Sequence, residues 1–380
     1  MPILRDRPTW FVYVAFFAFG WTFYALGPAF SFLREEQGTS RFVSSLHSLG
    51  LATGTLLSGL LLAWLTARFG RSITLRTGMV LVAAGTVWLC TGPSVWWTVP
   101  SVILVGFGGS TLINNGVAFL EAHHGEAHAA AISESTGVSG IANLVAPLGM
   151  GLAVGAGFGW RVGMLVAAPM FLVAFFIRFD GALLNRAQPT HRETGGLPIA
   201  YWKAWIILVC CFGAEYTIAL WAVDLLQTRG GLSAAAAAAG LAAFTAGITI
   251  SRFAGARLLQ NLDGELVFRG SLLLPALAWF GLWFSTNEVV MLVALGLMGT
   301  GVGLHFPLNM ARMMRASEGK PDRATARSAL AASLAAAAAP TGLGALGDLY
   351  GIHTAFILVQ GFLVIALALS TVWRVPELRS

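Results

Sequence analysis

Twelve long apolar segments occupy most of this chain, and each is near the ~20 residues that a helix needs to cross the hydrocarbon core of a bilayer. A soluble helical protein would instead show apolar stripes that repeat every 3.6 residues. The segments cover residues 9–33, 42–67, 72–92, 95–120, 128–156, 160–178, 202–226, 233–258, 267–285, 287–311, 324–346 and 352–373. The sequence therefore predicts an all-α membrane protein with 12 transmembrane helices, surrounded by a lipid bilayer.

The composition agrees with a surface that faces lipid. Hydrophobic residues make up 57% of the chain and charged residues only 11%, whereas soluble proteins carry about 25% charged residues. The 45 glycines fit the same environment, because small residues let transmembrane helices approach one another closely.

The basic residues indicate how the segments are oriented. Twelve spans with both ends on one side place the even-numbered loops and both termini in the cytoplasm. Of the 23 lysines and arginines, Arg252 lies inside a span and only Arg34, Arg41, Arg161 and Arg229 lie on the far side. This asymmetry follows the positive-inside rule and predicts a multi-pass protein of the cell membrane. Topology thus accounts for the net charge of +6, and no nucleic acid partner is expected.

The two halves of the chain match each other at an offset of 193 or 194 residues. This offset aligns Gly20 with Gly213, Gly109 with Gly303, Asn115 with Asn309, Ala122 with Ala316, Pro147 with Pro340, Gly149 with Gly342 and Gly151 with Gly344. Parallel repeats of six helices are an architecture of secondary transporters. We therefore expect two pseudo-symmetric six-helix bundles, at residues 1–178 and 202–380, joined by a cytoplasmic linker at 179–201.

The loop between the second and third spans carries a short basic motif. Its residues Arg68, Gly70 and Arg71 match the pattern G-x-x-x-D-R-x-G-R-R, while the sequence departs from that pattern at Ala63, Ala67 and Ser72. With this motif and the repeat, the chain resembles the major facilitator superfamily over essentially its whole length. The resemblance implies a monomeric secondary transporter whose first, fourth, seventh and tenth helices line a central cavity. The family's aspartate helps to latch the outward-open state, so Ala67 implies a weaker or different latch.

Other segments are similar to bacterial members of this family without identifying a substrate. Residues 140–151 resemble the antiporter motif of the fifth helix, but Ala146 replaces the glycine that precedes Pro147. Import and export therefore both stay open. Residues 215–221 and 301–309 resemble the seventh and tenth helices of proton-coupled solute carriers.

Ionisable side chains inside apolar spans are candidates for proton coupling, because each costs about 2.5–3.5 kcal/mol at the bilayer centre. Glu215 lies close to the middle of the seventh span, where a carboxyl can exchange a proton as access alternates. The alternative is a neutral carboxyl that ties two helices together. His305 is a second candidate, because histidine titrates near physiological pH, although it also fits a packing role. Glu134 is the third, with a gate or loop contact as its alternative.

The same reasoning suggests residues for the substrate site. Arg252 cannot lose its proton and so needs an anionic partner. That partner is either a carboxylate or phosphate of the substrate, or an acid such as Glu215. The other candidates are polar or aromatic side chains in the expected cavity helices: Trp21, Tyr24, Tyr216, Asn115 and Asn309. Aromatic residues at helical spacing also fit simple packing, and asparagines also fit interhelical hydrogen bonds.

Enzymes and ATP-driven pumps are disfavoured by the motifs that the sequence lacks. There is no G-x-x-x-x-G-K-S/T loop to bind a nucleotide,, and no nucleophile with a base at a recognisable spacing. His123, His124 and His128 lie close together without the ligand spacing of a metal site. We expect no enzymatic activity, no metal and no cofactor.

The sequence thus favours a secondary active transporter that moves a small organic solute by alternating access, coupled to protons. An anionic solute is narrowly preferred because of Arg252. Three alternatives remain: a drug–proton antiporter that exports lipophilic compounds, a passive uniporter, and a membrane sensor that does not transport.

Overall fold

A computed structural model describes residues 4–177 and 195–372, and this part of the chain is helical without a β-strand. Within these two ranges, fourteen α-helices and one 3₁₀ turn follow one another. Their bounds are α1 Arg7–Gln37, α2 Arg41–Phe69, α3 Arg71–Thr91, α4 Val95–His124, η1 Gly125–Ala127, α5 His128–Gly155, α6 Trp160–Leu165, α7 Ala167–Phe176, α8 Ile199–Thr228, α9 Ala234–Asn261, α10 Gly264–Phe284, α11 Glu288–Ala316, α12 Pro321–Tyr350, α13 Ile352–Ala355 and α14 Ile357–Val372.

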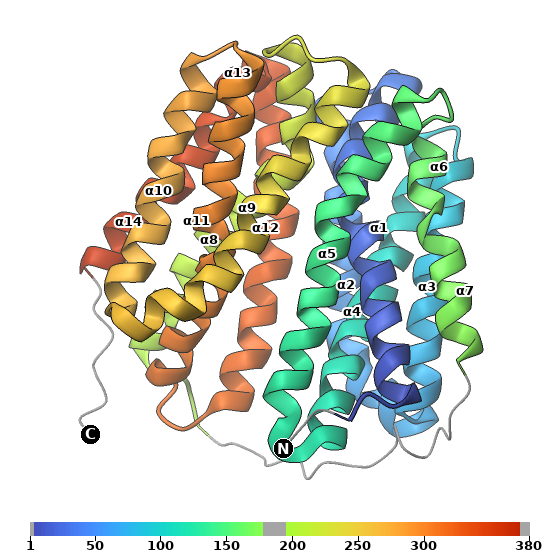
Figure 1. Ribbon diagram of the computed structural model, residues 1–380, viewed down its shortest axis with the longest axis vertical. Coiled ribbons are helices and arrows are strands. Elements are labelled where there is room, and N and C mark those ends of the chain that lie inside the picture. The colour runs from blue at the N-terminus through green and yellow to red at the C-terminus, as the bar shows by residue number, and fades with distance from the viewer. Residues whose placement is uncertain (1–3, 178–194, 373–380) are drawn as a thin grey trace. The chain divides into compact units, whose positions relative to one another are not determined.

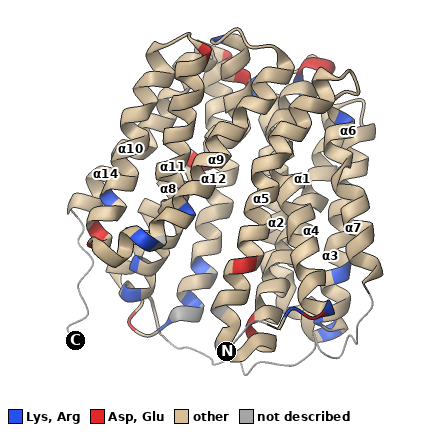
Figure 2. Ribbon diagram, viewed as in Figure 1, with Lys and Arg blue, Asp and Glu red and all other residues tan. Residues whose placement is uncertain are grey.

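These helices confirm the predicted membrane architecture. In the described residues, eleven helical segments are long and apolar enough to cross a membrane, and Trp160–Phe176 forms a shorter apolar helix. Lys, Arg, Asp and Glu gather toward the helix ends and leave the middle of most helices uncharged (Figure 2). The 12-helix fold predicted from the apolar runs is therefore correct.

The last span of each repeat is interrupted rather than continuous. Trp160–Phe176 is divided at Val166 into α6 and α7, and the final span is divided at Phe356 into α13 and α14. Pro169 explains the first interruption, because proline has no N–H with which to bond the carbonyl of Leu165 four residues earlier. No proline accounts for the break at Phe356.

Most helices extend beyond the apolar run from which they were predicted. At the start of α1, the Asp6 carboxylate accepts a hydrogen bond from the Thr9 amide at 3.1 Å, which caps the helix before the apolar residues begin. Its C-cap is Gly38, which has a φ of 58°. Polar residues at helix ends continue the backbone hydrogen bonding, which apolarity alone does not reveal. Residues 179–194 of the predicted linker lie outside the described part, and α8 begins at Ile199.

The chain divides into two compact units. The first comprises Met1–Thr39 with Leu46–Thr190, and the second comprises Ser40–Ser45 with His191–Ser380. In the first unit, α1 packs on α5 and α7, and α3 packs on α4; in the second, α8 packs on α12 and α14, and α10 packs on α11. Figure 1 labels these helices along the colour gradient. Since the offset of 194 residues maps α1 onto α8 and α4 onto α11, each unit repeats the same six-helix arrangement.

Glycines set the closest helix contacts, and they do so at matching places in both units. A Cβ at Gly54 would collide with the backbone carbonyl of Ile103, and one at Gly106 would collide with that of Leu51. Gly247 and Gly299 make the equivalent contacts between α9 and α11. Backbones this close require glycine on both helices, so the repeat extends to the packing of individual residues.

Candidate functional site

Glu215 lies at mid-height on α8, within two residues of the midpoint of Ile199–Thr228. Its side chain is partly buried, and Cys211 one turn earlier is close enough to interact with it electrostatically. Tyr216 stacks on Phe212 with ring centroids 5.4 Å apart. Phe306 of α11 packs on Phe212 at 5.7 Å. Glu215 therefore lies next in the chain to Tyr216, which belongs to a cluster of three aromatic rings with Phe212 and Phe306.

His305 contacts a different helix from its neighbour Phe306. The ring is buried, with 1% of its surface exposed, and its Nε2 lies 3.0 Å from the backbone carbonyl oxygen of Ser271 on α10. The other ring nitrogen, Nδ1, has no hydrogen-bond partner among the described residues. His305 thus joins α11 to α10, and the structure does not bond it to Glu215.

Arg252 is exposed on α9. Among the residues that the structure describes, it forms no ion pair, with Glu215 or with any other acid. The sequence had allowed an ion pair between Arg252 and an acid such as Glu215, and the described residues do not form it.

Asn115 and Asn309 occupy equivalent places in the two units, and each keeps one unsatisfied atom. The Oδ1 of Asn115 accepts a hydrogen bond from Thr66 Oγ1 at 3.3 Å, while its Nδ2 is buried without a described partner. Asn309 donates from Nδ2 to the carbonyl of Ala204 at 2.9 Å, and its Oδ1 is the orphan. Both asparagines therefore join helices, and each has one buried polar atom without a hydrogen-bond partner among the described residues.

Trp21 and Tyr24 are buried within the first unit, with 8% and 7% of their surfaces exposed. The Trp21 indole donates a hydrogen bond from Nε1 to the carbonyl of Gly163 on α6 at 2.9 Å. Tyr24 packs edge-on against Phe23, with centroids 5.5 Å apart. This geometry gives Trp21 a structural role that the sequence had weighed as its alternative.

Glu134 lies in the second turn of α5, away from the middle of the span. Its carboxylate pairs with Arg5 at 3.0 Å and accepts a hydrogen bond from the Tyr13 hydroxyl at 3.0 Å. These contacts join α5 to α1 and to the segment before it, which matches the loop-contact alternative. Nearby, His123 bonds Asp6 at 2.7 Å and no metal-binding group of three acids, histidines or cysteines exists in the described residues.

The motif residues lie at the junction of α2 and α3. Gly70 is the N-cap of α3 with a φ of 82°, in the left-handed region that favours glycine over other residues. Arg71 begins α3 and donates to the carbonyl of Ala118 on α4 at 3.4 Å. Arg68 is exposed, with its guanidinium 5.9 Å from the Phe69 ring. The motif therefore shapes a tight turn and attaches it to α4.

An ion pair in the second unit was not expected from the sequence. Arg312, assigned there to a cytoplasmic segment, is almost fully buried on α11. It pairs with Glu265 of α10 at 3.1 Å and lies over the Phe268 ring at 4.6 Å. Glu265 also pairs with Arg315 at 3.5 Å.

The repeat offset contains the signal for this pair. An offset of 194 residues aligns Arg71 with Glu265 and Glu121 with Arg315. In the first unit, Glu121 interacts electrostatically with Arg71. The two units thus use the same attachment between neighbouring helices with the signs of the charges exchanged, and a comparison of charged positions across the repeat would have found it.

Spanning helices in two repeated units, with polar side chains at mid-height, define a multi-span membrane transporter. A sequence model of the Major Facilitator Superfamily matches residues 12–320. The chain belongs to this superfamily, as its motif and repeat predicted.

Solved structures of low sequence identity share the fold. Two are crystal structures of a bacterial homologue of the human lysosomal transporter Spinster. The inward-facing, occupied form has a TM-score of 0.78 at 14% identity and covers 97% of this chain and 95% of that one. The inward-facing, unoccupied form has a TM-score of 0.69 at 14% identity and covers 98% of each chain. No curated protein sequence matches the chain.

Proposed function

We propose that this protein is a proton-coupled secondary active transporter of a small organic solute, located in the cell membrane with both termini in the cytoplasm. The observation that carries the proposal is the partly buried Glu215 at mid-height on α8. A change in the surroundings of a partly buried carboxyl can switch it between its charged and neutral forms. Alternating access would supply that change, so protonation of Glu215 would couple proton movement to solute movement.

Arg252 supports an anionic solute. Its side chain is exposed and lacks an ion pair among the described residues, and a guanidinium binds carboxylate or phosphate oxygens in a bidentate geometry. In this proposal Arg252 is a substrate ligand. His305 and Glu134 are weaker candidates for coupling, because each is already bonded within its own unit.

The aromatic cluster favours a second candidate, export of lipophilic cations. A cation is attracted to the face of an aromatic ring. Phe212, Tyr216 and Phe306 form a cluster of such rings, and Glu215 is the residue before Tyr216 in the chain. In that case Glu215 would bind the cation and the proton alternately, and Arg252 would have no role in binding.

Ligand-induced thermal stabilisation of the purified protein distinguishes the two candidates. Organic acids, sugars, amino acids and cationic drugs are screened at pH 5.5 and 7.5. Stabilisation by anions that disappears in Arg252→Ala supports the first candidate. Stabilisation by lipophilic cations that disappears in Glu215→Gln supports the second.

Proton coupling is then tested in liposomes with the solute found by that screen. We expect Glu215→Gln to abolish substrate-dependent proton movement, lowering it at least ten-fold, because an amide cannot exchange a proton at these pH values. Glu288→Gln is the matched control, since Glu288 is exposed in the first turn of α11, and it should transport normally. Proton movement that persists in Glu215→Gln would overturn the role of this carboxyl.

A further inference from the structure

Three arginines and one glutamate gather at one end of the second unit, where the start of α10 meets the end of α11. Glu265 of α10 pairs with Arg312 at 3.1 Å and with Arg315 at 3.5 Å, both on α11. Arg269, one turn after Glu265, lies close enough to Arg312 to repel it electrostatically, as does Arg315. These four residues form the basic cluster, and its net charge is +2 because three guanidinium groups share one carboxylate.

The equivalent place in the first unit is electrically balanced. There Arg71 and Glu121 attract each other as one pair. The offset of 194 residues aligns Arg312 with Ala118, so Arg312 is an additional cation in the second unit. It is only 1% exposed, and burying a charge is costly unless opposite charge compensates it. Since the carboxylate of the basic cluster is shared with Arg315, the cluster as a whole attracts a further negative charge.

Part of the basic cluster lies at the surface, where a ligand can reach it. The side chain of Arg315 is 42% exposed and that of Glu265 is 28% exposed. Arg269 is partly buried and donates a hydrogen bond to the carbonyl of Ser370 on α14 at 3.4 Å. An anion can therefore contact the Arg315 guanidinium from outside, without entering between the helices.

An exposed apolar face of α10 begins beside the basic cluster. Leu266, Leu273 and Leu277 are 60%, 46% and 58% exposed, and their spacing places them on one side of the helix. Arg269 lies close to that side, three residues after Leu266 and four before Leu273,. From Arg269 to Leu277 the helix rises about 12 Å, which is within one leaflet of a hydrocarbon core of ~30 Å. The cations therefore stand at one end of a face that contacts hydrocarbon.

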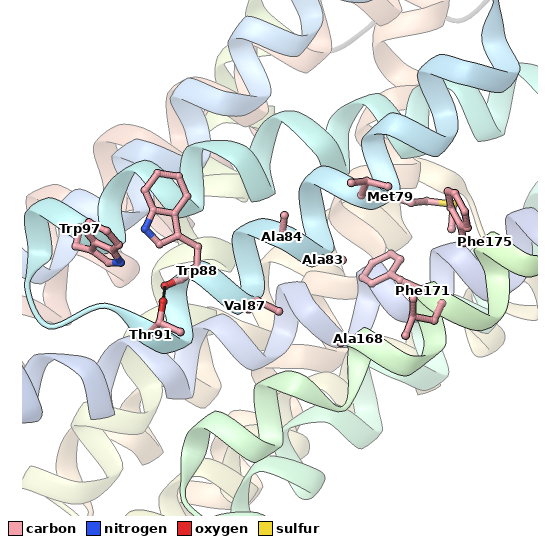
Figure 3. A pocket seen from close by; sticks show the side chains of 12 residues that line it. Met79, Ala83, Ala84, Val87, Trp88, Thr91, Trp97, Ala168, Phe171 and Phe175 are labelled. Atoms are coloured by element: carbon pink, nitrogen blue, oxygen red, sulfur yellow. Dashed lines mark hydrogen bonds between the residues drawn. The ribbon is translucent and has the colours of Figure 1, made fainter.

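The exposed apolar groove of the first unit lacks this combination of features. It has a volume of about 770 Å³ and lies between α3, α7 and the start of α4, with Met79, Trp88 and Phe171 among its lining residues (Figure 3). All of its lining residues are uncharged, so they do not distinguish one lipid headgroup from another. In the basic cluster, positive charge and contact with hydrocarbon occur together. That combination matches an anionic lipid better than a soluble anion, which has no apolar part.

We propose that the basic cluster binds the phosphate of one anionic glycerophospholipid, whose acyl chains lie along the exposed leucines of α10. Arg315 and Arg269 contact the phosphate oxygens, because a guanidinium binds phosphate through paired N–H groups. Basic pockets between transmembrane helices on the cytoplasmic side are suited to such headgroups, and this end of α10 is cytoplasmic in the proposed topology. Neither Glu215 nor Arg252 belongs to the basic cluster, so the site is tested separately from transport.

Native mass spectrometry of the full-length, delipidated protein tests the site with two lipids that have the same acyl chains. These are dioleoyl phosphatidylglycerol, which is anionic, and dioleoyl phosphatidylcholine, which has no net charge. We expect one saturable phosphatidylglycerol per wild-type chain, bound about ten-fold more tightly than phosphatidylcholine, because each basic residue near the surface strengthens binding of an anionic lipid. Inorganic phosphate in large excess, which has the same chemistry without acyl chains, should not displace the lipid.

Variants of the exposed cation test the basic cluster itself. Arg315→Gln should weaken phosphatidylglycerol about five-fold, the contribution of one basic residue, and leave phosphatidylcholine unchanged. Arg315→Lys keeps the charge and should bind phosphatidylglycerol nearly as well as wild type. Arg68→Gln is the matched control, because Arg68 is exposed in the last turn of α2 in the first unit, and it should bind both lipids as wild type does.

Each of three results would overturn the proposal. Equal binding of the two lipids to wild type would mean that the cluster does not recognise charge. An equal loss in Arg315→Gln and Arg68→Gln would assign the effect to the overall charge of the protein. Displacement of phosphatidylglycerol by inorganic phosphate would identify a site for a free anion in place of a lipid.

Discussion

Buried polar atoms in this protein differ in whether a hydrogen-bond partner among the described residues satisfies them. Trp21 and Trp221 hold their own units together through indole hydrogen bonds to carbonyls of neighbouring helices. Asn115 and Asn309 each keep one orphan amide atom. Leaving such an atom unpaired costs about 1–3 kcal/mol, which offsets part of the stabilisation from the hydrogen bond that each side chain does make.

At the residue scale, Asp6 gives a prediction about pH. Burial by itself would raise the pKa of the Asp6 carboxyl, but hydrogen bonds from Thr9 and from His123 outweigh it and hold the pKa below its ordinary value. As the pH falls, the unfolded chain takes up this proton first. The stabilisation from charged Asp6 is therefore complete above about pH 4 and is lost as the pH falls through the lower, folded pKa.

Asp6→Ala removes both the charge and the helix cap. We expect it to lower stability by about 1 kcal/mol near pH 7, and its deficit relative to wild type should shrink below pH 4. Asp6→Asn keeps a capping oxygen and should lose less at pH 7. Melting of the detergent-solubilised protein between pH 7 and 3 measures both; a deficit for Asp6→Ala that stays constant down to pH 3 would contradict the role of the charge.

At the scale of elements, the two units repeat the same contacts between neighbouring helices. The glycine contacts of α2 with α4 reappear between α9 and α11, and the Arg71 attachment reappears as Glu265 with reversed charge. A close backbone contact has few solutions besides glycine, whereas an ion pair works with either sign. The glycine contacts are therefore repeated at the same positions in both units. The ion pair is repeated at the same positions too, but its positive and negative residues are exchanged.

Two glycines of α2 test this packing with one substitution. Gly54→Ala would force α2 and α4 apart, because its Cβ would meet the Ile103 carbonyl, and overpacking of this kind costs about 1–3 kcal/mol. Gly59 lies five residues later in the same helix with nothing within 4 Å of an added Cβ, so Gly59→Ala is the matched control and should melt like wild type. Equal melting of the two variants would show that the contact does not limit stability.

At the scale of the whole molecule, the helices of each unit are joined to one another by hydrogen bonds within that unit. The hydrogen bonds of Trp21 and Tyr13 close the first unit between α1 and its later helices, and Trp221 with Tyr201 does the same for the second. We propose that the division near residue 190 also separates two independently folding parts.

This proposal predicts that residues 1–190 and 191–380, produced as separate chains, each yield a helical, monodisperse protein that melts cooperatively in detergent. The control is a cut at Gly125, which separates α1 from its partner α5 and should give aggregated fragments. Circular dichroism and size-exclusion chromatography measure the result. Aggregation of both natural halves, with no better outcome than for the control cut, would contradict independent folding.

The sequence was sufficient for the twelve spans and their repeat, although not for the breaks at Val166 and Phe356. A membrane leaves few alternatives, because each backbone polar group must be satisfied within its own helix, so a run of ~20 apolar residues already specifies an element. The mid-height position of Glu215 follows from the same count. The superfamily could be recognised because Arg68, Gly70 and Arg71 stand at fixed spacing in a turn that requires a positive φ at Gly70.

Tertiary structure alone decided what each polar residue contacts. Position along a helix gives depth in the membrane, but direction around the helix depends on neighbours that are distant in sequence. His305 and Phe306 are adjacent, yet one bonds α10 and the other joins the aromatic cluster of α8. Glu134 pairs with Arg5 across 129 residues, and the groove beside Trp88 exists only because α3, α4 and α7 meet there. Such partners are selected by packing between helices, which no local pattern records.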